Sequence, residues 1–545
     1  MANNTLYGAS AVDIRAFNHQ YNVRGAANYV TGSHAFKVGL QHMWGTRNFQ
    51  YTTTQNQLWS FFNGAPVAIT QYARPLEDYQ KLKTALGLYA QDRWTIRNIT
   101  LNLGLRFDYH NAYVPALSIP ALQFVPAKDY PETPDTPSWK NISPRAGIAW
   151  DLFANGHTVL RANYGKYVAS ESVATTTANN PVNTRINSAT RTWLDTNGNF
   201  RPDCDLTQTG VSGECFALSA PLGNPNIVTT WDANVLRGWN VRPDDGEFLV
   251  GVQHQLHERL MMDVQWTRHW FGNFFATQYR ATPPGDYDSF CITTPTDSRL
   301  PDGGGKQICG FMDLKQSAFG RTPDNFVTAA KNFGDVTDVY NGIDLTFTSR
   351  LPNGGVASGG VSSGRERTDF CNVIGQAGMT ANTDSTAGRV GETNISNYPS
   401  PLYCKVTPPY QPDWKGLITY PLPYGISASA TWQNRAGAQR LATYVVTAAQ
   451  TTLGRAFSGG AATQTLQIIE PGTAYDDRLN QVDARIAKTF RVGQARIQGT
   501  LSLFNLFNAG TPLTLNSRFS TTTPWPQPTR ILQSRLFKVG AQIDF

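Results

Sequence analysis

Apolar and polar residues alternate along much of this chain, and its last eleven residues show the pattern most simply. Between 535 and 545 every second side chain is apolar: Phe537, Val539, Ala541, Ile543 and Phe545. A period of two places neighbouring side chains on opposite faces of a strand, and about ten residues let a tilted strand cross a bilayer. The segment is predicted to be a terminal outer-membrane strand, with Phe545 as its C-terminal barrel signal. The edge of a soluble β-sandwich is the alternative.

The same alternation returns in several other runs. The clearest lies at 99–109, and shorter ones lie at 146–152, 260–266, 343–347, 482–486 and 497–503. No window contains eighteen apolar residues in succession, so the sequence predicts no transmembrane helix. Because every backbone N–H and C=O must be paired inside hydrocarbon, the remaining membrane-spanning solution is a closed barrel. We therefore expect an all-β fold, an antiparallel transmembrane outer-membrane β-barrel.

The connections between these runs alternate between short and long. Tight turns are predicted around 32–34, 97–98, 154–156, 257–258, 352–355, 421–425 and 492–493. Long polar segments separate the hairpins, at 46–82, 112–140, 170–245, 271–337, 369–413, 437–478 and 508–530. Short turns on one rim and long extracellular loops on the other are typical of outer-membrane barrels. Seven hairpins and the final strand make fifteen strands. Since bacterial single-chain barrels have even strand numbers, either a sixteenth strand lies within 5–17 or the chain is part of a larger barrel.

Composition narrows the class of protein. Charged residues make up 16% of the 545 residues, below the roughly 25% of soluble domains, and the chain has 47 Gly and 12% aromatic residues. This length exceeds one ordinary soluble core, so we expect either several domains or one large barrel. The net charge of +7 is dispersed. Such a distribution argues against nucleic acid as a partner and is compatible with an anionic glycolipid surface such as lipopolysaccharide.

Several motifs also resemble a known family. The segments LGLYAQDRW at 86–94, ITLNLGLRFD at 99–108 and SPRAGIAW at 143–150 are similar to the barrel of TonB-dependent outer-membrane receptors. The segment LFNLFN at 503–508 resembles the penultimate strand of that family. Further segments resemble its Oar-like subgroup, whose members carry a carboxypeptidase-regulatory-like domain before the plug: 195–205, 303–310, 339–344 and 401–404. The resemblance extends over nearly the whole chain.

The resemblance has implications for domain organisation. Family members begin with a secretion signal, followed by a periplasmic TonB box and a plug inside a barrel of twenty-two strands. None of these is readable here, and residues 1–5 show neither a basic n-region nor an apolar h-region. Residues 1–545 are interpreted as the C-terminal part of such a receptor barrel, from which the signal peptide, TonB box and plug are absent.

Six cysteines fall in three neighbouring pairs: Cys204 with Cys215, Cys291 with Cys309, and Cys371 with Cys404. Of the fifteen possible connectivities, only this one keeps each bridge within one long loop and none inside a strand. A zinc site would need closely spaced ligands, and the sequence has no C-x-x-C motif. We therefore predict three disulfides and an oxidising compartment. Closing a loop of about fifteen residues stabilises by about 3 kcal/mol in the chain-entropy model.

The longest loop contains a run of oxygen-bearing side chains: Asp195, Asn197, Asn199, Asp203 and Asp205. The first three occupy positions one, three and five of a calcium-binding loop. Position six is Phe200 rather than Gly, and position twelve is Leu206 rather than Glu. The run is a candidate structural Ca²⁺ site, and no other cofactor is indicated. The alternative is an Asx-rich turn whose side chains hydrogen-bond to their own backbone.

No enzymatic centre is indicated by the sequence. The eight His residues are scattered, and neither a G-x-S-x-G motif nor a phosphate-binding loop is present. His254 and His269 lie on predicted strands near a turn or rim, where packing accounts for them. Aromatic residues near strand ends are interpreted as interfacial girdle residues, with sugar stacking as the alternative: Trp94, Tyr109, Trp150, Trp266 and Trp270.

The functional hypothesis combines the polar strand faces with the family resemblance. By parity, the charged candidates for a lumen lining are Arg106, Asp108, Arg145, Asp151, Arg161, Asp344, Asp483 and Arg485. The resemblance implies a transporter for TonB-energised uptake of a scarce nutrient, in which extracellular loops bind the ligand and TonB pulls on the plug. Outer-membrane lipid and the barrel assembly machinery are further expected partners. A passive porin and an outer-membrane hydrolase are the alternative functions.

Overall fold

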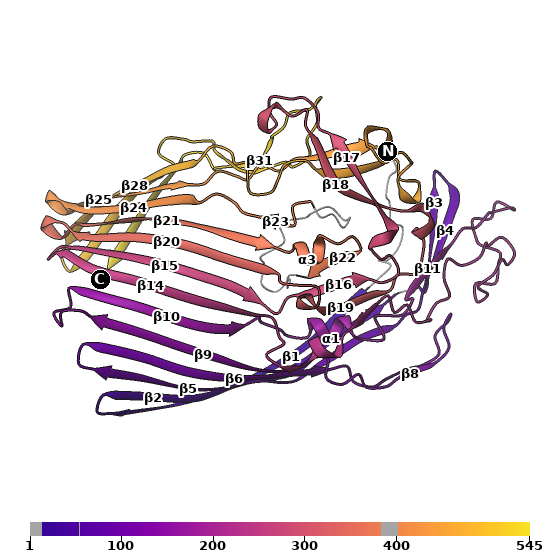
Figure 1. Ribbon diagram of the computed structural model, residues 1–545, viewed down its shortest axis with the longest axis horizontal. Coiled ribbons are helices and arrows are strands. Elements are labelled where there is room, and N and C mark those ends of the chain that lie inside the picture. The colour runs from indigo at the N-terminus through magenta and orange to yellow at the C-terminus, as the bar shows by residue number, and fades with distance from the viewer. Residues whose placement is uncertain (1–12, 54, 383–401, 545) are drawn as a thin grey trace.

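A single antiparallel meander dominates the computed structural model, which describes residues 13–53, 55–382 and 402–544, so that Phe545 lies outside the described residues (Figure 1). Fifteen long strands, which we call the wall, each pair with the next along the chain. Their bounds are β1 (Asp13–Thr31), β2 (His34–Thr52), β5 (Leu76–Ile96), β6 (Ile99–Tyr113), β9 (Ser138–Asp151), β10 (Thr158–Val168), β14 (Asp244–His257), β15 (Leu260–Gly272), β20 (Thr337–Arg350), β21 (Val356–Asp369), β24 (Gln411–Leu422), β25 (Ile426–Arg435), β28 (Leu479–Val492), β29 (Ala495–Phe504) and β32 (Leu536–Asp544). The short strands β13 (Arg237–Trp239) and β23 (Lys405–Val406) extend the same sheet.

All seven predicted tight turns are confirmed, and they lie at one rim of the wall, on the left in Figure 1. The first turn joins Thr31 of β1 to His34 of β2, and its Gly32 has a φ of +53°. This left-handed conformation favours glycine, which has no Cβ to clash with the backbone. The register of each hairpin follows from such a turn, because neighbouring strands start pairing directly beside it.

Seven long connections leave the opposite rim, and together we call them the loop layer. Their described residues are 53, 55–75, 114–137, 169–243, 273–336, 370–382 with 402–410, 436–478 and 505–535. The first is shorter than predicted, because β2 continues to Thr52 and β5 begins at Leu76. The layer's strands are β3 (Gln57–Phe62), β4 (Ala65–Tyr72), β7 (Leu117–Ile119), β8 (Lys128–Tyr130), β11 (Ser188–Arg191), β12 (Thr229–Trp231), β16 (Phe275–Tyr279), β17 (Tyr287–Thr293), β18 (Gln307–Leu314), β19 (Asn325–Ala329), β22 (Met379–Asn382), β26 (Thr443–Thr447), β27 (Thr463–Gln467), β30 (Pro512–Leu515) and β31 (Pro528–Ile531).

Helices in the described residues are short. The α-helices are α1 (Ala174–Ala178), α2 (Ala233–Leu236) and α3 (Cys371–Ile374), all in the loop layer. The 3₁₀ turns are η1 (Pro284–Asp286), η2 (Pro301–Gly303), η3 (Gln316–Ala318), η4 (Ala330–Asn332), η5 (Pro352–Gly354), η7 (Pro423–Gly425), η8 (Ala448–Gln450) and η9 (Ser458–Gly460). None of the described helices has the length and apolar character needed to cross a membrane.

The first wall strands are longer than expected from the sequence. β1 and β2 contain 19 residues each and β5 contains 21. At about 3.3 Å per residue these strands are about twice as long as the roughly 30 Å hydrocarbon core. The predicted length of about ten residues is therefore wrong for them, because polar stretches continue the same ladder beyond the membrane. Residues 13–17 belong to β1 and form no separate sixteenth strand, and residues 5–12 lie outside the described part.

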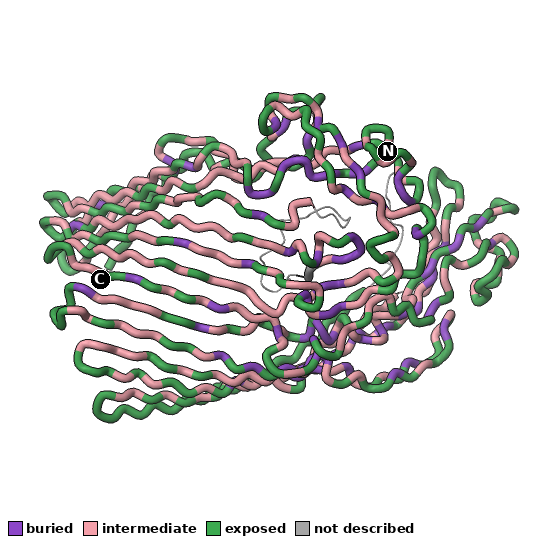
Figure 2. The backbone as a smooth tube through the Cα atoms, viewed as in Figure 1, coloured by how far each residue is buried: buried purple, intermediate pink, exposed green. Residues whose placement is uncertain are grey.

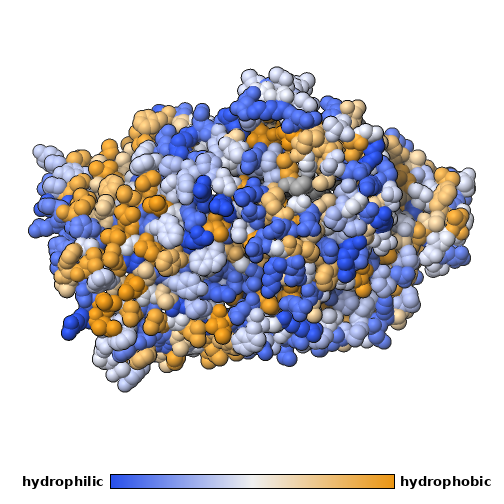
Figure 3. All heavy atoms as spheres, in the orientation of Figure 1, coloured by the Kyte–Doolittle hydropathy of each residue, from blue (hydrophilic) through white to orange (hydrophobic). Residues whose placement is uncertain are grey.

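One face of the wall is apolar and exposed. Residues paired directly across antiparallel strands lie on the same face, and the registers place a continuous set of apolar side chains there. Examples that are 40–79% exposed are Leu105, Val250, Ile343, Ile486 and Val539. Hydrophobic residues gather over the tight-turn half of the wall in Figure 3. An apolar band on the outside of the strands is the arrangement that lipid requires.

Three of the five aromatic residues predicted for a girdle lie near strand ends on this apolar face. Trp94 lies two residues before the end of β5, Trp150 one residue before the end of β9, and Trp270 two residues before the end of β15. The ring of Trp270 stacks on that of Tyr164, with centroids 6.3 Å apart. Two residues depart from the prediction, because Trp266 lies midway along β15 and Tyr109 lies four residues before the end of β6.

The loop layer contains hydrophobic cores of its own. The largest joins the connections 273–336, 436–478 and 505–535 and includes five aromatic residues that are 4% exposed or less: Phe290, Phe311, Phe457, Phe519 and Trp525. Figure 2 shows buried segments in the loop half, whereas intermediate and exposed residues predominate along the wall strands. Packing between connections that are distant in the sequence therefore holds the layer together.

The three predicted disulfides are present, and each lies in a different part of the loop layer. Cys204–Cys215 lies beside the core of Ile69 and Trp193, Cys291–Cys309 joins β17 to β18, and Cys371–Cys404 links the two ends of one connection. No described cysteine is free, and none lies in a wall strand.

Candidate functional site

The lumen candidates occupy a single face of the wall, which we call the polar face. One row of directly paired residues passes through five strands: Gln91, Gly104, Arg145, Gly165 and Glu247. Register and the alternation along each strand then place every candidate on the side of this row: Arg106, Asp108, Arg145, Asp151, Arg161, Asp344, Asp483 and Arg485. The apolar side chains described above lie on the opposite face. That the eight residues line a translocation path stays a prediction.

The loop layer folds back onto the polar face at the mouth of the wall. Arg47 of β2 donates to Asp78 Oδ2 and Gln80 Oε1 of β5 at 2.8 and 2.7 Å. Asp78 Oδ1 also accepts hydrogen bonds from Asn180 and Asn183, which belong to the connection 169–243. Asp78 is 3% exposed. This buried polar cluster anchors the connection over the polar face, so this face is the enclosed side of the wall.

Two of the candidate arginines have carboxylate partners on the polar face. Arg106 pairs with Asp108 at 2.8 Å on the same strand, and Arg161 of β10 pairs with Asp263 of β15. Arg106 contacts the carboxylate of Asp108 through both Nε and Nη2, as in a two-point pair, whereas Arg161 donates to Asp263 through Nη2 alone.

The remaining acidic candidates accept hydrogen bonds from nearby groups. Asp483 Oδ1 accepts from Gln481 Nε2 at 2.9 Å, and Asp344 accepts from Ser362 Oγ on the next strand. Asp151 Oδ2 accepts from the backbone N–H of Gly156 at 2.7 Å. Asp151 therefore stabilises the tight turn between β9 and β10, at the rim of the polar face rather than along its length.

Charge is segregated along the polar face. Strands β2 to β10 contribute six cationic residues, Lys37, Arg47, Arg93, Arg106, Arg145 and Arg161, together with Asp78, Asp108 and Asp151. Strands β14 to β25 contribute seven anionic residues and three cationic residues: Asp245, Glu247, Asp263, Asp338, Asp344, Glu366 and Asp413, and Arg350, Lys415 and Arg435. A solute beside this face meets a mainly basic region on one side and a mainly acidic region on the other.

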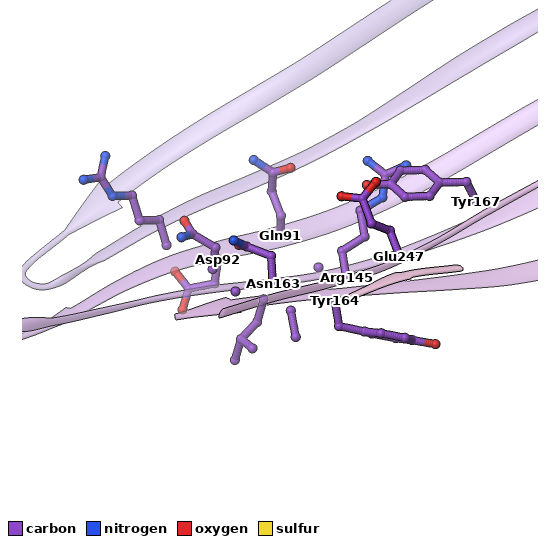
Figure 4. Close-up of a pocket in the computed structure, with 14 residues that line it drawn as sticks. Gln91, Asp92, Arg145, Asn163, Tyr164, Tyr167 and Glu247 are labelled. Carbon is purple, nitrogen blue, oxygen red and sulfur yellow. The ribbon is translucent and has the colours of Figure 1, made fainter. Parts of the chain in front are cut away.

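A cavity of about 250 Å³ lies on the polar face where these two regions meet, and we call it the wall pocket. In Figure 4 the side chains of Gln91, Arg145, Asn163, Tyr167 and Glu247 lie on one side of the sheet, while Tyr164 points away on the other. The guanidinium carbon of Arg145 lies 4.6 Å from the centroid of the Tyr167 ring. On the polar face, the lining comprises two cations, one anion and three amides: Arg93, Arg145, Glu247, Gln91, Asn102 and Asn163.

A second, larger cavity of about 670 Å³ lies in the acidic region. Its polar side includes Asp344, Asp413, Asp483 and Lys415. Asp344 already accepts a hydrogen bond from the next strand, and Asp483 accepts one from Gln481 on its own strand, so part of the polar lining of this cavity is satisfied within the wall.

The calcium candidates form an exposed Asx-rich turn. Asp195 accepts from the backbone N–H groups of Asn199 and Phe200 at 3.0 and 2.9 Å. Asp203 Oδ2 accepts from the side-chain amides of Asn197 and Asn199 at 2.6 and 2.8 Å. Phe200, at position six, has a φ of +60°, the left-handed conformation for which a calcium loop uses glycine. Calcium binding here stays a prediction.

Asp205, the last calcium candidate, accepts its side-chain hydrogen bonds from Thr207 and Gln208 rather than from the other candidates. Its Oδ1 accepts from the hydroxyl and backbone N–H of Thr207, and its Oδ2 from Gln208. The Thr207 hydroxyl bond, followed by these other bonds, lowers the pKa of Asp205 below its usual value. Within the described residues, no group of three or more His, Cys, Asp or Glu side chains could hold a metal ion.

The two histidines singled out in the sequence make local contacts in the wall. His254 Nδ1 lies 2.8 Å from Thr158 Oγ1 beside a tight turn, and His269 Nε2 lies 2.9 Å from Asp245 Oδ2 near the loop rim. These contacts agree with packing roles.

Of the polar-face residues that line the wall pocket, sequence reasoning identified Arg145 and missed six polar ones: Gln91, Arg93, Asn102, Asn163, Tyr167 and Glu247. The alternation of Phe248, Val250 and Val252 could have identified β14 and placed Glu247 on its polar side. Pairing between β10 and β14 could not be read from the sequence, because the connection 169–243 separates the two strands.

The chain is similar to known outer-membrane proteins. A family model described as an outer membrane beta barrel domain matches residues 1–355. The TonB-dependent transporter Oar of Myxococcus xanthus is 24% identical over 220 residues, which amount to 38% of this chain and 19% of that protein.

Solved structures of transporters are also similar in fold. The outer membrane transporter YddB from Escherichia coli is 13% identical with a TM-score of 0.48, over 97% of this chain and 54% of that chain. The copper transporter OprC is 12% identical with a TM-score of 0.45, over 98% of this chain and 57% of that chain. This chain therefore spans just over half the length of these two structures.

Proposed function

Because this chain belongs to the outer membrane β-barrel family, we propose that it forms the wall and ligand-capturing mouth of an outer-membrane transporter that TonB energises. Its ligand is a scarce nutrient that the loop layer binds at the cell surface. The similarity to the TonB-dependent transporter Oar supports the energised mechanism.

The observation that carries the proposal is the folded loop layer anchored over a polar wall face. Asp78 fixes Asn180 and Asn183 of the connection 169–243 above this face, and three disulfides hold the connections in shape. A pre-formed mouth of this kind binds a ligand at lower entropic cost than mobile loops would.

In the proposed cycle, ligand capture and translocation are separate steps. The loop layer binds the ligand first. TonB then pulls on a plug enclosed by the wall, and the ligand passes along the polar face, which offers charged groups and amides in place of water. No covalent chemistry is involved.

The apolar face has a matching role in the proposal. It contacts the hydrocarbon of the outer membrane, while the exposed loop layer lies beside lipopolysaccharide. We propose that the barrel assembly machinery inserts the wall, because unpaired strand groups in lipid cost several kcal/mol each. The outer edges of β1 and β32 must be paired for the same reason. Within the described residues, no strand pairing joins β1 to β32.

Uptake measured with and without TonB tests the proposal. The protein is expressed from its native locus in otherwise identical cells that have or lack TonB, and growth is scored on limiting nutrients supplied one at a time. We expect at least one nutrient to require both this protein and TonB. Uptake that requires the protein but not TonB would indicate a passive porin, and hydrolysis of esters or peptides without uptake would indicate an enzyme.

We further propose that the 195–205 loop binds Ca²⁺ as a structural ion. Calorimetric titration of the purified protein with Ca²⁺ tests this, with Asp195→Asn and Asp203→Asn as variants that remove charged ligands. Saturable binding that both variants weaken supports the site. Identical heats for the original protein and the variants would show that the loop does not bind Ca²⁺ through these side chains and is an Asx-rich turn only.

A further inference from the structure

We propose that the wall pocket binds the charged termini of a zwitterionic ligand, of the size of a short peptide, as that ligand passes along the polar face. This inference rests on the proposed transport function and names the chemical class of the solute. Arg145 would bind the carboxylate of the ligand and Glu247 its ammonium group.

Arg145 is the cation of the pocket that shares a directly paired row with Glu247, and its environment leaves it available, while Arg93 of β5 is a second cation in the lining. Arg106 and Arg161 pair with Asp108 and Asp263. Among the described residues, by contrast, no carboxylate forms an ion pair with Arg145, whose guanidinium instead stacks on the Tyr167 ring at 4.6 Å. Stacking holds the planar group in one orientation while its N–H donors stay open at the edge. Such a group binds a carboxylate through two parallel hydrogen bonds.

Glu247 is the matching anion. It lies in the same directly paired row as Arg145, with Gly165 of β10 between them. In the described part of the chain Glu247 has no ion pair. Two strand spacings of about 4.8 Å separate the two backbones, giving about 10 Å between them. The two side chains extend into this space, and an extended dipeptide, about 7 Å long, fits between such groups better than a single amino acid.

Two glycines on the sheet leave room for the side chains that line the pocket. A Cβ added to Gly165 would lie 2.7 Å from Tyr167 Oη, and one added to Gly147 would lie 2.5 Å from Asn163 Oδ1. The missing side chains therefore let Tyr167 and Asn163 lie flat against the sheet. The amides of Asn163 and Gln91 then face the cavity and can donate to, and accept from, a peptide bond.

The position of the pocket adds an orienting field. The mainly basic strands end at β10 and the mainly acidic strands begin at β14, and the pocket spans this boundary. A solute with both charges is aligned by such a field, whereas a neutral sugar gains nothing from it and a singly charged solute is repelled by one side.

Calorimetric binding to the purified full-length protein in detergent tests the proposal without TonB or energy. The probes are dialanine, N-acetyl-dialanine, dialanine amide, doubly capped dialanine and sucrose. We expect dialanine to bind about tenfold or more tightly than the doubly capped peptide, because each charge-assisted hydrogen bond contributes about a factor of ten. Sucrose should show no saturable binding.

Two variants assign each charge to one end of the ligand. Arg145→Gln should weaken N-acetyl-dialanine about tenfold and leave dialanine amide unchanged, and Glu247→Gln should do the reverse. Arg259→Gln and Glu258→Gln, at the tight turn between β14 and β15, make the same charge changes away from the polar face and should leave all affinities unchanged. Heat-modifiable migration in gels confirms that each variant is folded.

Equal effects of Arg145→Gln on both singly capped probes would overturn the assignment, as would equal binding of dialanine and its doubly capped form. Absence of any saturable dialanine binding by the folded protein would also overturn it. These outcomes are independent of the uptake experiment, since TonB-dependent uptake with no zwitterion binding would retain the transport function and reject this ligand class.

Discussion

The wall and the loop layer use apolar side chains in opposite ways. Ile343 in the wall is 54% exposed on the apolar face, whereas Phe457 in the loop layer is fully buried among other aromatic rings. The polar groups are reversed as well: Asp78 on the polar face of the wall is 3% exposed, whereas most residues of the Asx-rich turn at 195–205 in the loop layer are exposed.

This difference shows that the two regions obtain their hydrophobic stabilisation from different sources. In the loop layer, each large apolar side chain that is buried against other residues of the layer stabilises the fold by about 1.5 to 3 kcal/mol. The wall gains comparable hydrophobic stabilisation only when lipid covers its apolar face. Its backbone hydrogen bonds supply the remaining stability of the wall. The two regions should therefore respond to different substitutions.

The largest expected effect is on the loop layer, from Phe457→Ala. Removal of this buried ring, whose centroid lies 6.0 Å from that of Phe290, should cost the layer about 3 to 5 kcal/mol. Limited proteolysis should then cleave the connections 436–478 and 505–535 rapidly, while heat-modifiable migration of the wall stays unchanged. Phe216→Ala, which alters a half-exposed loop ring, is the control. Joint loss of wall and loop layer would show that they form one cooperative unit and would break the comparison.

A smaller but still large effect is expected on the wall, from Ile343→Arg. An arginine on the lipid side near mid-strand should destabilise the barrel by about 2 to 4 kcal/mol. Urea titration of the protein folded into liposomes measures this change. Thr346→Arg, three residues further along β20 and on the polar face, is the matched control and should change stability little. Equal effects of the two arginines would contradict the assignment of the faces.

Loss of the Cys291–Cys309 disulfide should have the next largest effect. Replacing both residues with Ala removes the link between β17 and β18. The unfolded loop layer gains entropy, so its stability should fall by about 3 kcal/mol, with none lost from the wall. Hydrogen exchange resolved by region measures both quantities. Non-reducing peptide mapping of the exported protein should first recover this link, and free thiols there would refute the premise.

The smallest effect should be a pH dependence confined to the loop layer. Hydrogen bonds from the Arg299 side chain, and then from its backbone N–H, lower the pKa of Asp297 to about 2. Arg299 in turn donates to the carbonyls of Ser520 and Thr523, which ties two connections together. Since the folded pKa lies below the ordinary value of about 3.9, this stabilisation is complete above that pH and is lost as the pH falls towards 2.

Proteolysis of the loop layer as a function of pH tests this tie. In the original protein, cleavage within 505–535 should rise only as the pH falls below about 4. Asp297→Asn should show a modestly higher rate at neutral pH and a smaller additional rise in acid. A variant with the same pH profile as the original protein would remove Asp297 from the explanation.

The sequence was sufficient to predict the strands and tight turns of the wall, but not the hydrophobic core inside the loop layer. Alternation at 99–109 and turn residues such as Gly32 are local signals, and local signals determine strands, hairpins and the face on which Arg106 or Asp344 lies. The core that joins Phe290 to Phe457 has no local signature, because its members come from different connections. The wall pocket was missed for the same reason, since Arg145 and Glu247 approach only through the pairing of β10 with β14.

The nearest-neighbour pairing of the wall has an evolutionary consequence. Each wall strand between β1 and β32 pairs with the strands before and after it in the meander, so duplication or deletion of one hairpin leaves the registers of the more distant hairpins intact. Genetic change can therefore alter the circumference of such a wall two strands at a time, while selection acts on each connection of the loop layer separately.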